Sequence, residues 1–568
     1  MMRTMRESHA PFRMRILAGY LLAVAILPAQ ADEPSPAPAV TTASKGSALS
    51  VASVVTLRAN DGRLLDLEPE AGLVRLLGHG ELQLRGSAMS DQPLDRMPTH
   101  AAAISSSRRQ ALGQRAFGAQ WLRLRPTLQL AEHVSVVAQA DVFSGLWVGD
   151  LTRDVGADGS PRDAYDSIGS AELRWAYLEW RTRWGMLRAG RQSMHWGLGM
   201  LANDGDHRPR FGDYRKGTIQ DRMLLEARPL GETSPLVFAV AGDRVRRDQF
   251  SDDARGDETY QGVAAISWRG EHVESGVYGA VRQQTNARGG QAALYTDKAK
   301  ALLGDFYARA VSELTPDVQG FVGAEVAFVA AASDNPRTTT SMQANGRTKT
   351  RGAIGLLAEL GIMGGRVEAT GLRAQAKWVF TVEYGHASGQ ADARGGQQSR
   401  FSFDPNHRVG LVLFDEVIRW QTARSATALR DPAFAGAGIP AAGSELLPTN
   451  GGVVGTAYVQ PSFVFRPDAS LDVCLGILLA QATSDVVDPY RVAADGMVVN
   501  YTGGAPRGRD YGVEVDGAIE KRWVSSAGLV PQLGLQGGVL FPGTALADEK
   551  GNTMRPPWVV QGRAGLQF

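Results

Sequence analysis

The stretch Pro557-Trp558-Val559-Val560-Gln561-Gly562-Arg563-Ala564-Gly565-Leu566-Gln567-Phe568 carries the strongest indication of the fold. Even positions from Trp558 onward are apolar or small, whereas Gln561, Arg563 and Gln567 occupy odd positions. Neighbouring side chains of a strand point to opposite faces of a sheet, so this stretch predicts a strand with one apolar and one polar face. The period alone fits a soluble sheet as well as a membrane one.

The same alternation, bounded by turn residues, recurs along most of the chain. It predicts an all-β fold with about eighteen strands. The expected strands cover 80–89, 116–130, 134–147, 169–181, 185–192, 218–228, 235–243, 260–269, 273–283, 300–312, 318–331, 351–368, 374–387, 453–466, 471–484, 510–524, 529–541 and 557–568.

The links between these strands alternate strictly in length. Links after even-numbered strands are short, as at 131–133 and 270–272. Links after odd-numbered strands are long, as at 148–168 and 388–452. This asymmetry is typical of a transmembrane antiparallel β-barrel, with short periplasmic turns and long extracellular loops. An even strand number places both ends of the array on the periplasmic side. A large soluble β-protein would explain the alternation but not the asymmetry.

Charged residues within the strands predict which face meets the lumen. Arg123 and Arg125 alternate with apolar residues in Leu122–Leu130, and an arginine facing lipid near the bilayer midplane costs about 2–4 kcal/mol. Both are therefore expected to face the lumen, and the same argument assigns other charges to that face. The predicted pore-lining residues are Arg123, Arg125, Asp141, Glu172, Arg174, Arg282, Glu325, Lys377, Glu383, Asp472, Glu514, Asp516 and Arg563.

Aromatic residues mark the opposite face. Trp268, Phe465, Trp523 and Phe568 fall on the expected lipid face near the short-turn ends, where they would form a girdle at headgroup level. The final strand, which ends on Phe568, resembles the closing strand of bacterial outer-membrane barrels. That resemblance implies contact with outer-membrane lipid and with the barrel-assembly machinery.

The amino-terminal residues predict export. Arginines precede an apolar run from Ile16 to Leu27, followed by Pro28-Ala29-Gln30-Ala31, which is the pattern of a secretory signal peptide cleaved after Ala31. Residues 1–31 are thus the expected signal peptide and 32–57 a Pro/Ala/Ser-rich tether. The stretch 58–79 is expected to be either a periplasmic segment or part of a plug, before a barrel over 80–568. The predicted location is the outer membrane of a Gram-negative bacterium.

Composition narrows the function further. Lys and Arg number 60 against 59 Asp and Glu, which gives no basic excess for a nucleic-acid partner. The sequence contains no run of about 18 apolar residues, so it predicts no transmembrane helix. Cys474 is the single cysteine and cannot form an intramolecular disulfide.

The link 388–452 is too long for an ordinary connection, and loops of that size are usually functional or disordered. Its part from Val409 to Trp420 is apolar enough to pack. Our hypothesis is that this part folds into the lumen as a constriction.

The stretch Gly190-Arg191-Gln192-Ser193-Met194-His195-Trp196-Gly197-Leu198-Gly199-Met200 resembles a segment of alginate-export-type outer-membrane porins. The hairpin Asp510–Trp523 with Leu533–Gly543 is similar to the penultimate strands of that group. The combination of Gly190–Asp206, Phe211-Gly212-Asp213 and Phe403–Val417 also resembles large uncharacterised barrel proteins of myxobacteria and their relatives. The resemblance implies a porin-like barrel that passes a small or polymeric hydrophilic solute. The mixed charges expected in the lumen depart from a strongly basic polysaccharide exporter.

Candidate solute contacts lie around the same stretch. Arg188 and Arg191 are three residues apart, so a regular strand places them on opposite faces unless a bulge intervenes. His195 and Trp196 enter a long loop and could bind a sugar by stacking, although a packing role is the simpler interpretation. Asn203-Asp204-Gly205-Asp206, near Asp213, lacks the spacing of a calcium loop and predicts a polar turn.

No arrangement of residues predicts catalysis. Ser193 and His195 could share a strand face, but no orienting acid can be named. We therefore expect no enzyme, no cofactor and no metal. The predicted function is an outer-membrane channel, porin-like, for a hydrophilic solute or an exported polysaccharide. The alternative is a plugged, non-conducting barrel that serves as a surface-interaction or structural scaffold.

Overall fold

The computed structural model describes most of the chain beyond residue 74. The described residues are 75–90, 115–149, 170–213, 217–231, 233–285, 298–334, 348–369, 372–390, 392, 397–429, 448–523, 525 and 528–568. The expected signal peptide, the tether and residues 58–74 lie outside them.

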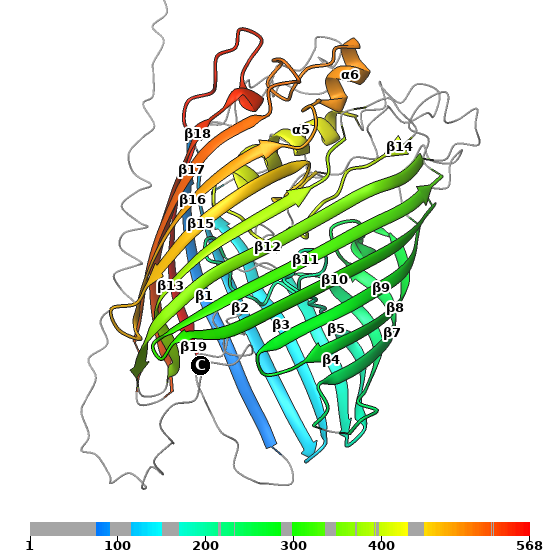
Figure 1. Cartoon of the computed structure of the whole chain (residues 1–568), viewed down its shortest axis with the longest axis vertical. Coiled ribbons are helices and arrows are strands. Elements are labelled where there is room, and N and C mark those ends of the chain that lie inside the picture. Colours follow the sequence, from blue (N-terminus) through cyan, green and yellow to red (C-terminus); the bar gives the residue numbers. More distant parts are fainter. Residues whose placement is uncertain are drawn as a thin grey trace, which may run out of the picture. The chain divides into compact units, whose positions relative to one another are not determined.

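Strands account for most of the described residues (Figure 1). They are β1 (Arg75–Met89), β2 (Arg115–Ala131), β3 (Val134–Val148), β4 (Ser170–Thr182), β5 (Gly185–Gln192), β6 (Ile219–Ala227), β7 (Leu236–Arg247), β8 (Glu258–Arg269), β9 (Val273–Thr285), β10 (Lys298–Thr315), β11 (Val318–Ser333), β12 (Thr348–Ala369), β13 (Leu372–Ala387), β14 (Gln397–Gln398), β15 (Thr456–Phe465), β16 (Leu471–Ala482), β17 (Asp510–Arg522), β18 (Val530–Pro542) and β19 (Trp558–Gln567).

Helical elements are short and lie in the links between strands. They are η3 (Asp253–Arg255), the π-helical η5 (Leu413–Ile418), α5 (Arg419–Leu429), α6 (Pro489–Asp495) and η7 (Thr544–Leu546). Within the described residues, no helix is both long enough and apolar enough to cross a bilayer.

The sheet closes on itself through its first and last strands. Strand β1 pairs antiparallel with both β2 and β19, and Phe568 exchanges backbone hydrogen bonds of 2.7 and 3.0 Å with Gly80. Of the 19 strands in the described residues, only the two-residue β14 stands outside this ring, lying parallel to part of β12. The other strands confirm the predicted antiparallel barrel of about eighteen strands.

The expected strand bounds hold to within a few residues, with two informative exceptions. Strand β1 begins at Arg75, five residues before the expected start, so 75–79 belong to the wall and not to the segment assigned to 58–79. Strand β7 continues to Arg247, beyond the expected end at 243. Both extensions are paired with a neighbouring strand, so backbone hydrogen bonds continue the strand where the sequence shows no regular alternation.

The two faces of the wall differ as the alternation predicts. In β16, Leu475 is 59% exposed, whereas Leu478 on the other face is fully buried. Apolar residues on the outer face of nearby strands are exposed in the same way, as Val515 is in β17 and Leu535 is in β18. The predicted girdle residues Trp268, Phe465, Trp523 and Phe568 are also exposed.

Two links fold into the barrel and pack against its inner face. We call residues 193–213 and 217–218, between β5 and β6, loop A, and residues 399–429, between β14 and β15, loop B. Glu514 of β17 accepts hydrogen bonds from three consecutive backbone amides of loop B, at Leu411, Val412 and Leu413, over 2.6–2.8 Å. Its neighbour Val515 is exposed on the outer face, so Glu514 and loop B lie inside.

A buried apolar cluster joins the two loops to the wall. Loop A contributes Leu198, Met200 and Phe211, and loop B contributes a longer apolar run. The ring of Phe211 lies close against the wall at Gly476, where an added Cβ would come within 2.6 Å of it. Other members of the cluster include Phe403, Val409, Leu411, Phe414, Val417, Ile418, Leu478, Tyr511 and Leu540.

A charge on the outer face provides a test of its environment. We expect Leu535→Arg to destabilise the folded barrel by about 2–4 kcal/mol, because arginine would enter hydrocarbon near mid-height of β18. Urea unfolding in lipid vesicles measures the change, with Leu535→Met as the matched control. An unchanged midpoint for the arginine variant would mean that this face meets water.

Candidate functional site

Loop A begins with a tight turn built on two glycines. Gly197 and Gly199 have φ angles of 57° and 82°, a region that favours glycine, and the Gly199 amide donates to the Trp196 carbonyl over 2.9 Å. A Cβ on Gly199 would lie 2.9 Å from the His195 ring. The turn therefore brings the His195 side chain close to the returning backbone.

Two carboxylates of the wall hold this turn. Glu325 of β11 accepts hydrogen bonds from the backbone amides of Leu198 and Leu201. Asp305 of β10 accepts a hydrogen bond of 2.8 Å from the indole of Trp196, which also packs edge-on against Tyr307. The turn is thus fixed against one side of the barrel.

Asp206 connects loop A to the opposite part of the wall through arginines. It accepts hydrogen bonds from Arg123 of β2 and from Arg174 of β4, the latter at 2.6 Å, and Arg125 lies 3.6 Å away. Arg123 also makes a two-pronged ion pair with Asp141 of β3 at 2.7 and 3.0 Å. Because these groups are buried, each arginine depends on a carboxylate to offset its desolvation.

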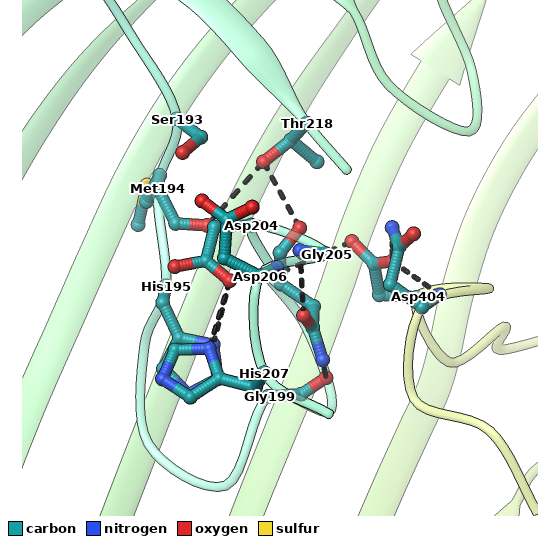
Figure 2. Close-up of polar contacts among 12 residues, drawn as sticks. Ser193, Met194, His195, Gly199, Asp204, Gly205, Asp206, His207, Thr218 and Asp404 are labelled. Carbon is teal, nitrogen blue, oxygen red and sulfur yellow. Dashed lines mark hydrogen bonds and ion pairs between the residues drawn. The ribbon is translucent and has the colours of Figure 1, made fainter. Parts of the chain in front are cut away.

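Asp204 faces two imidazoles at the centre of loop A (Figure 2). Its Oδ1 lies 2.8 Å from His207 Nδ1 and 3.9 Å from His195 Nδ1, and the two rings stack with centroids 3.8 Å apart. Two consecutive Asx turns shape this segment, because the Gly205 amide donates to Asn203 and the Asp206 amide to Asp204.

The trio titrates unusually. Burial, together with the charge of the neighbouring His207, lowers the pKa of His195 to about 3. Burial alone would lower the pKa of His207, but the charge and hydrogen bond of Asp204 raise it above its ordinary value. For the carboxyl group of Asp204, burial would raise the pKa, yet the two histidines hold it below its usual range. At neutral pH, His195 is therefore an uncharged imidazole.

Asp404 links loop A to loop B. It accepts hydrogen bonds from the Asn203 amide at 3.2 Å and from the backbone and side chain of Asn406, and its own amide donates to the Met200 carbonyl. Burial raises the pKa of Asp404 to about 7, although these hydrogen bonds oppose the shift. The contact between the loops thus depends on a carboxyl group that changes charge near neutrality.

The far end of loop A reaches the remaining wall. Arg208 pairs with Glu520 of β17, and Asp213 accepts a 2.7 Å hydrogen bond from Arg563 of β19. Arg210 lies 3.9 Å from Glu383 of β13, which also accepts a hydrogen bond from Tyr458. Loop A therefore contacts strands all around the barrel.

The predicted pore-lining residues fall into three groups. Arg123, Arg125, Arg174, Glu325, Glu383, Glu514 and Arg563 contact the inward loops. Asp141, Glu172, Arg282 and Asp472 pair with other charges, respectively Arg123, Arg247, Asp248 and Arg466. Asp516 is buried beside Glu514, and Lys377 is exposed. Whether these residues line a conducting path stays a prediction.

The two candidate arginines of β5 lie on opposite faces, as a regular strand requires. Arg188 pairs across the strands with Glu179 and stacks on Tyr177. Arg191 pairs with Asp221 over 2.9 Å on the outer face, so its side chain points away from the lumen. Ser193 accepts a hydrogen bond from the Trp175 indole, and no contact joins it to His195 among the described residues.

The charges of the wall could be predicted from the sequence, but the charged residues of loop A that pair with them could not. Asp206, His207 and Arg208 were assigned to an ordinary polar turn or left without a role. The signal that could have found them is a run of charged residues after a glycine-rich turn, which is costly to bury unless the wall supplies opposite charges.

Comparisons with known proteins return only distant structures. No protein-family model and no curated protein matches the chain. Similar solved structures include the outer membrane protein OprD from Pseudomonas aeruginosa, with 9% identity over 86% of this chain and 94% of that chain, at a TM-score of 0.43. OccK9 (OpdG) from the same organism has 12% identity over 86% and 97%, at a TM-score of 0.44.

The arginine contacts of Asp206 should dominate the stability of loop A. We expect Asp206→Asn to destabilise the folded protein by about 3–5 kcal/mol, because buried arginines lose their carboxylate. Asp253→Asn is the matched control, since its partners Arg244 and Arg246 are partly exposed and such pairs contribute about 0–1 kcal/mol. Equal urea midpoints for the two variants would contradict the buried pairing.

Asp404 should make stability depend on pH. A carboxyl group whose pKa is raised on folding stabilises the fold fully below its unfolded pKa, and this contribution is lost as pH rises through the folded pKa. We therefore expect the wild type to lose stability between about pH 4 and pH 7, relative to Asp404→Asn. Urea midpoints of both proteins across this range measure the difference, and parallel curves would refute the expectation.

Proposed function

We propose that this protein is a porin-like channel of the outer membrane of a Gram-negative bacterium. The observation that carries the proposal is a closed wall with apolar residues exposed outside and paired charges inside. Such a wall suits hydrocarbon on one side and an aqueous interior on the other. Export would use the predicted signal peptide, and assembly would use the last strand with Phe568.

The inward loops favour a small hydrophilic solute over a polymer. Loops A and B meet at Asp404 and Asn203, and together they contact β2, β4, β11, β13, β17 and β19. A path between them is therefore narrow and bordered by both signs of charge. Narrow, charged constrictions select by size and by electrostatic barriers.

Several polar groups at this level are available to a solute. The side chains of Arg188, Arg210 and Glu172 are each 21–25% exposed, although all three have ionic partners. Trp196 and His195 of loop A are the aromatic candidates for contact with a solute. We propose Arg188, Trp196 and His195 as the solute contacts, with polar hydroxyl or carboxylate groups as their targets.

A plugged barrel is the second candidate, and a specific observation favours it. The apolar cluster that joins both loops to the wall has members that are fully buried, among them Met200, Leu411 and Leu540. A dry cluster of this kind inside a barrel blocks that part of the cross-section. Conductance distinguishes a narrow channel from a complete plug.

Planar-bilayer recording of the full chain tests the proposal. We expect defined conductance steps in the wild type, and larger steps when residues 409–425 are replaced by a short Gly/Ser linker, because loop B then leaves the lumen. Phe414→Ala, which only thins the cluster, should give a smaller increase in the same direction.

Replacement of 288–295, in the link between β9 and β10, serves as the control and should leave conductance unchanged. Heat-modifiable migration confirms that each variant is folded. Silence of a folded wild type, with conductance appearing only after the loop B replacement, would establish the plugged scaffold and overturn the channel.

A further inference from the structure

His195, Asp204 and His207 place three potential metal ligands together inside loop A. One ligand atom from each lies within 4.8 Å of the other two, and the two histidine rings stack beside the same carboxylate oxygen. Tetrahedral zinc, with bonds of about 2.0–2.1 Å, requires ligand atoms about 3.3 Å apart. The observed separations of 2.8 and 3.9 Å from Asp204 bracket that distance.

Among the described residues, one buried ring nitrogen of this trio makes no hydrogen bond. His195 Nδ1 is buried and has no hydrogen-bond partner in the part of the chain that the structure describes, while Asp204 and His207 bond to each other. A buried polar atom without a partner is costly and calls for an explanation. An ion between the three side chains would use the lone pair of His195 Nδ1 and replace the hydrogen shared by His207 and Asp204.

We propose that His195, Asp204 and His207 bind a divalent transition-metal ion through two imidazole nitrogens and one carboxylate oxygen. The sequence predicts no metal, so such a site would depart from that prediction. Two nitrogens with one oxygen suit zinc and its neighbours, whereas calcium and magnesium prefer oxygen ligands alone. Three protein ligands leave a fourth position for water or for a solute group.

The surroundings of the trio are compatible with a cation. Arg123 and Arg174 of the wall are both paired with Asp206, two residues from Asp204. Arg309, whose charge reaches both imidazoles, is paired with Glu274 over 3.0 Å.

The trio is also geometrically supported. The His195 ring is confined by the close approach of Gly199, and Asp204 Oδ1 is held by the Asp206 amide at 2.9 Å. Thr218 donates to the carbonyls of Met194 and Asn203, which ties the two ends of the segment together (Figure 2). Such outer contacts orient metal ligands and raise affinity.

Cobalt(II) titration of the folded, tag-free full chain in detergent tests the proposal. We expect one equivalent to bind and to give the visible absorption of four-coordinate cobalt, which zinc then abolishes by displacement. His207→Ala and His195→Gln should each weaken binding by at least about tenfold, since even outer-shell changes cost that much.

The matched control is His133→Ala, which removes an exposed histidine from the turn between β2 and β3 and should bind as the wild type does. Absence of cobalt uptake by the folded wild type would overturn the site. Uptake that survives in both loop A variants would overturn it equally. The inference stands apart from the proposed channel, because metal binding is read by absorbance and conductance by recording, so either can fail alone.

Discussion

The antiparallel pairing of β1 with β19 is the constraint on which this structure depends. Nine consecutive residue pairs, from Glu81 with Gln567 to Met89 with Val559, close the sheet and leave its wall without a free edge. Open edges present unpaired amides and carbonyls that neither lipid nor a packed interior can satisfy. Once the wall is closed, each side chain faces either outward or inward. The alternation in every strand is the consequence.

The interior then imposes its own requirement. Charges on the inner face are cut off from bulk water where loops A and B fill the barrel, and a buried charge must be paired. The wall and the loops satisfy each other: Asp206 neutralises the arginines of β2 and β4, while Glu514 and Glu325 accept loop amides. The same contacts that stabilise the charges fix the loops in place. The position of the loops and the neutralisation of the inner charges therefore depend on one set of interactions.

Loop A combines two kinds of chemistry within a few residues. The Asx turns at Asn203 and Asp204 point Asp206 toward the arginines and Asp204 toward the histidines. Asp206 thus belongs to a structural ion-pair network, whereas Asp204 belongs to a candidate metal site. Anchoring through Asp206 holds Asp204 in position, so the geometry of the trio depends on wall residues that never touch it.

The sequence by itself determined the barrel, the approximate strand bounds and the side that Arg123, Glu383 or Glu514 faces. These features follow from a two-residue period and from the cost of charge in hydrocarbon, both of which are local. Tertiary structure alone decided that Asp206 meets Arg123 and Arg174, that Glu325 binds the turn at Leu198, and that His195 stacks on His207. Such contacts join residues 12 to 127 positions apart across a closed wall, and no local period encodes which strand a folded-in loop will reach.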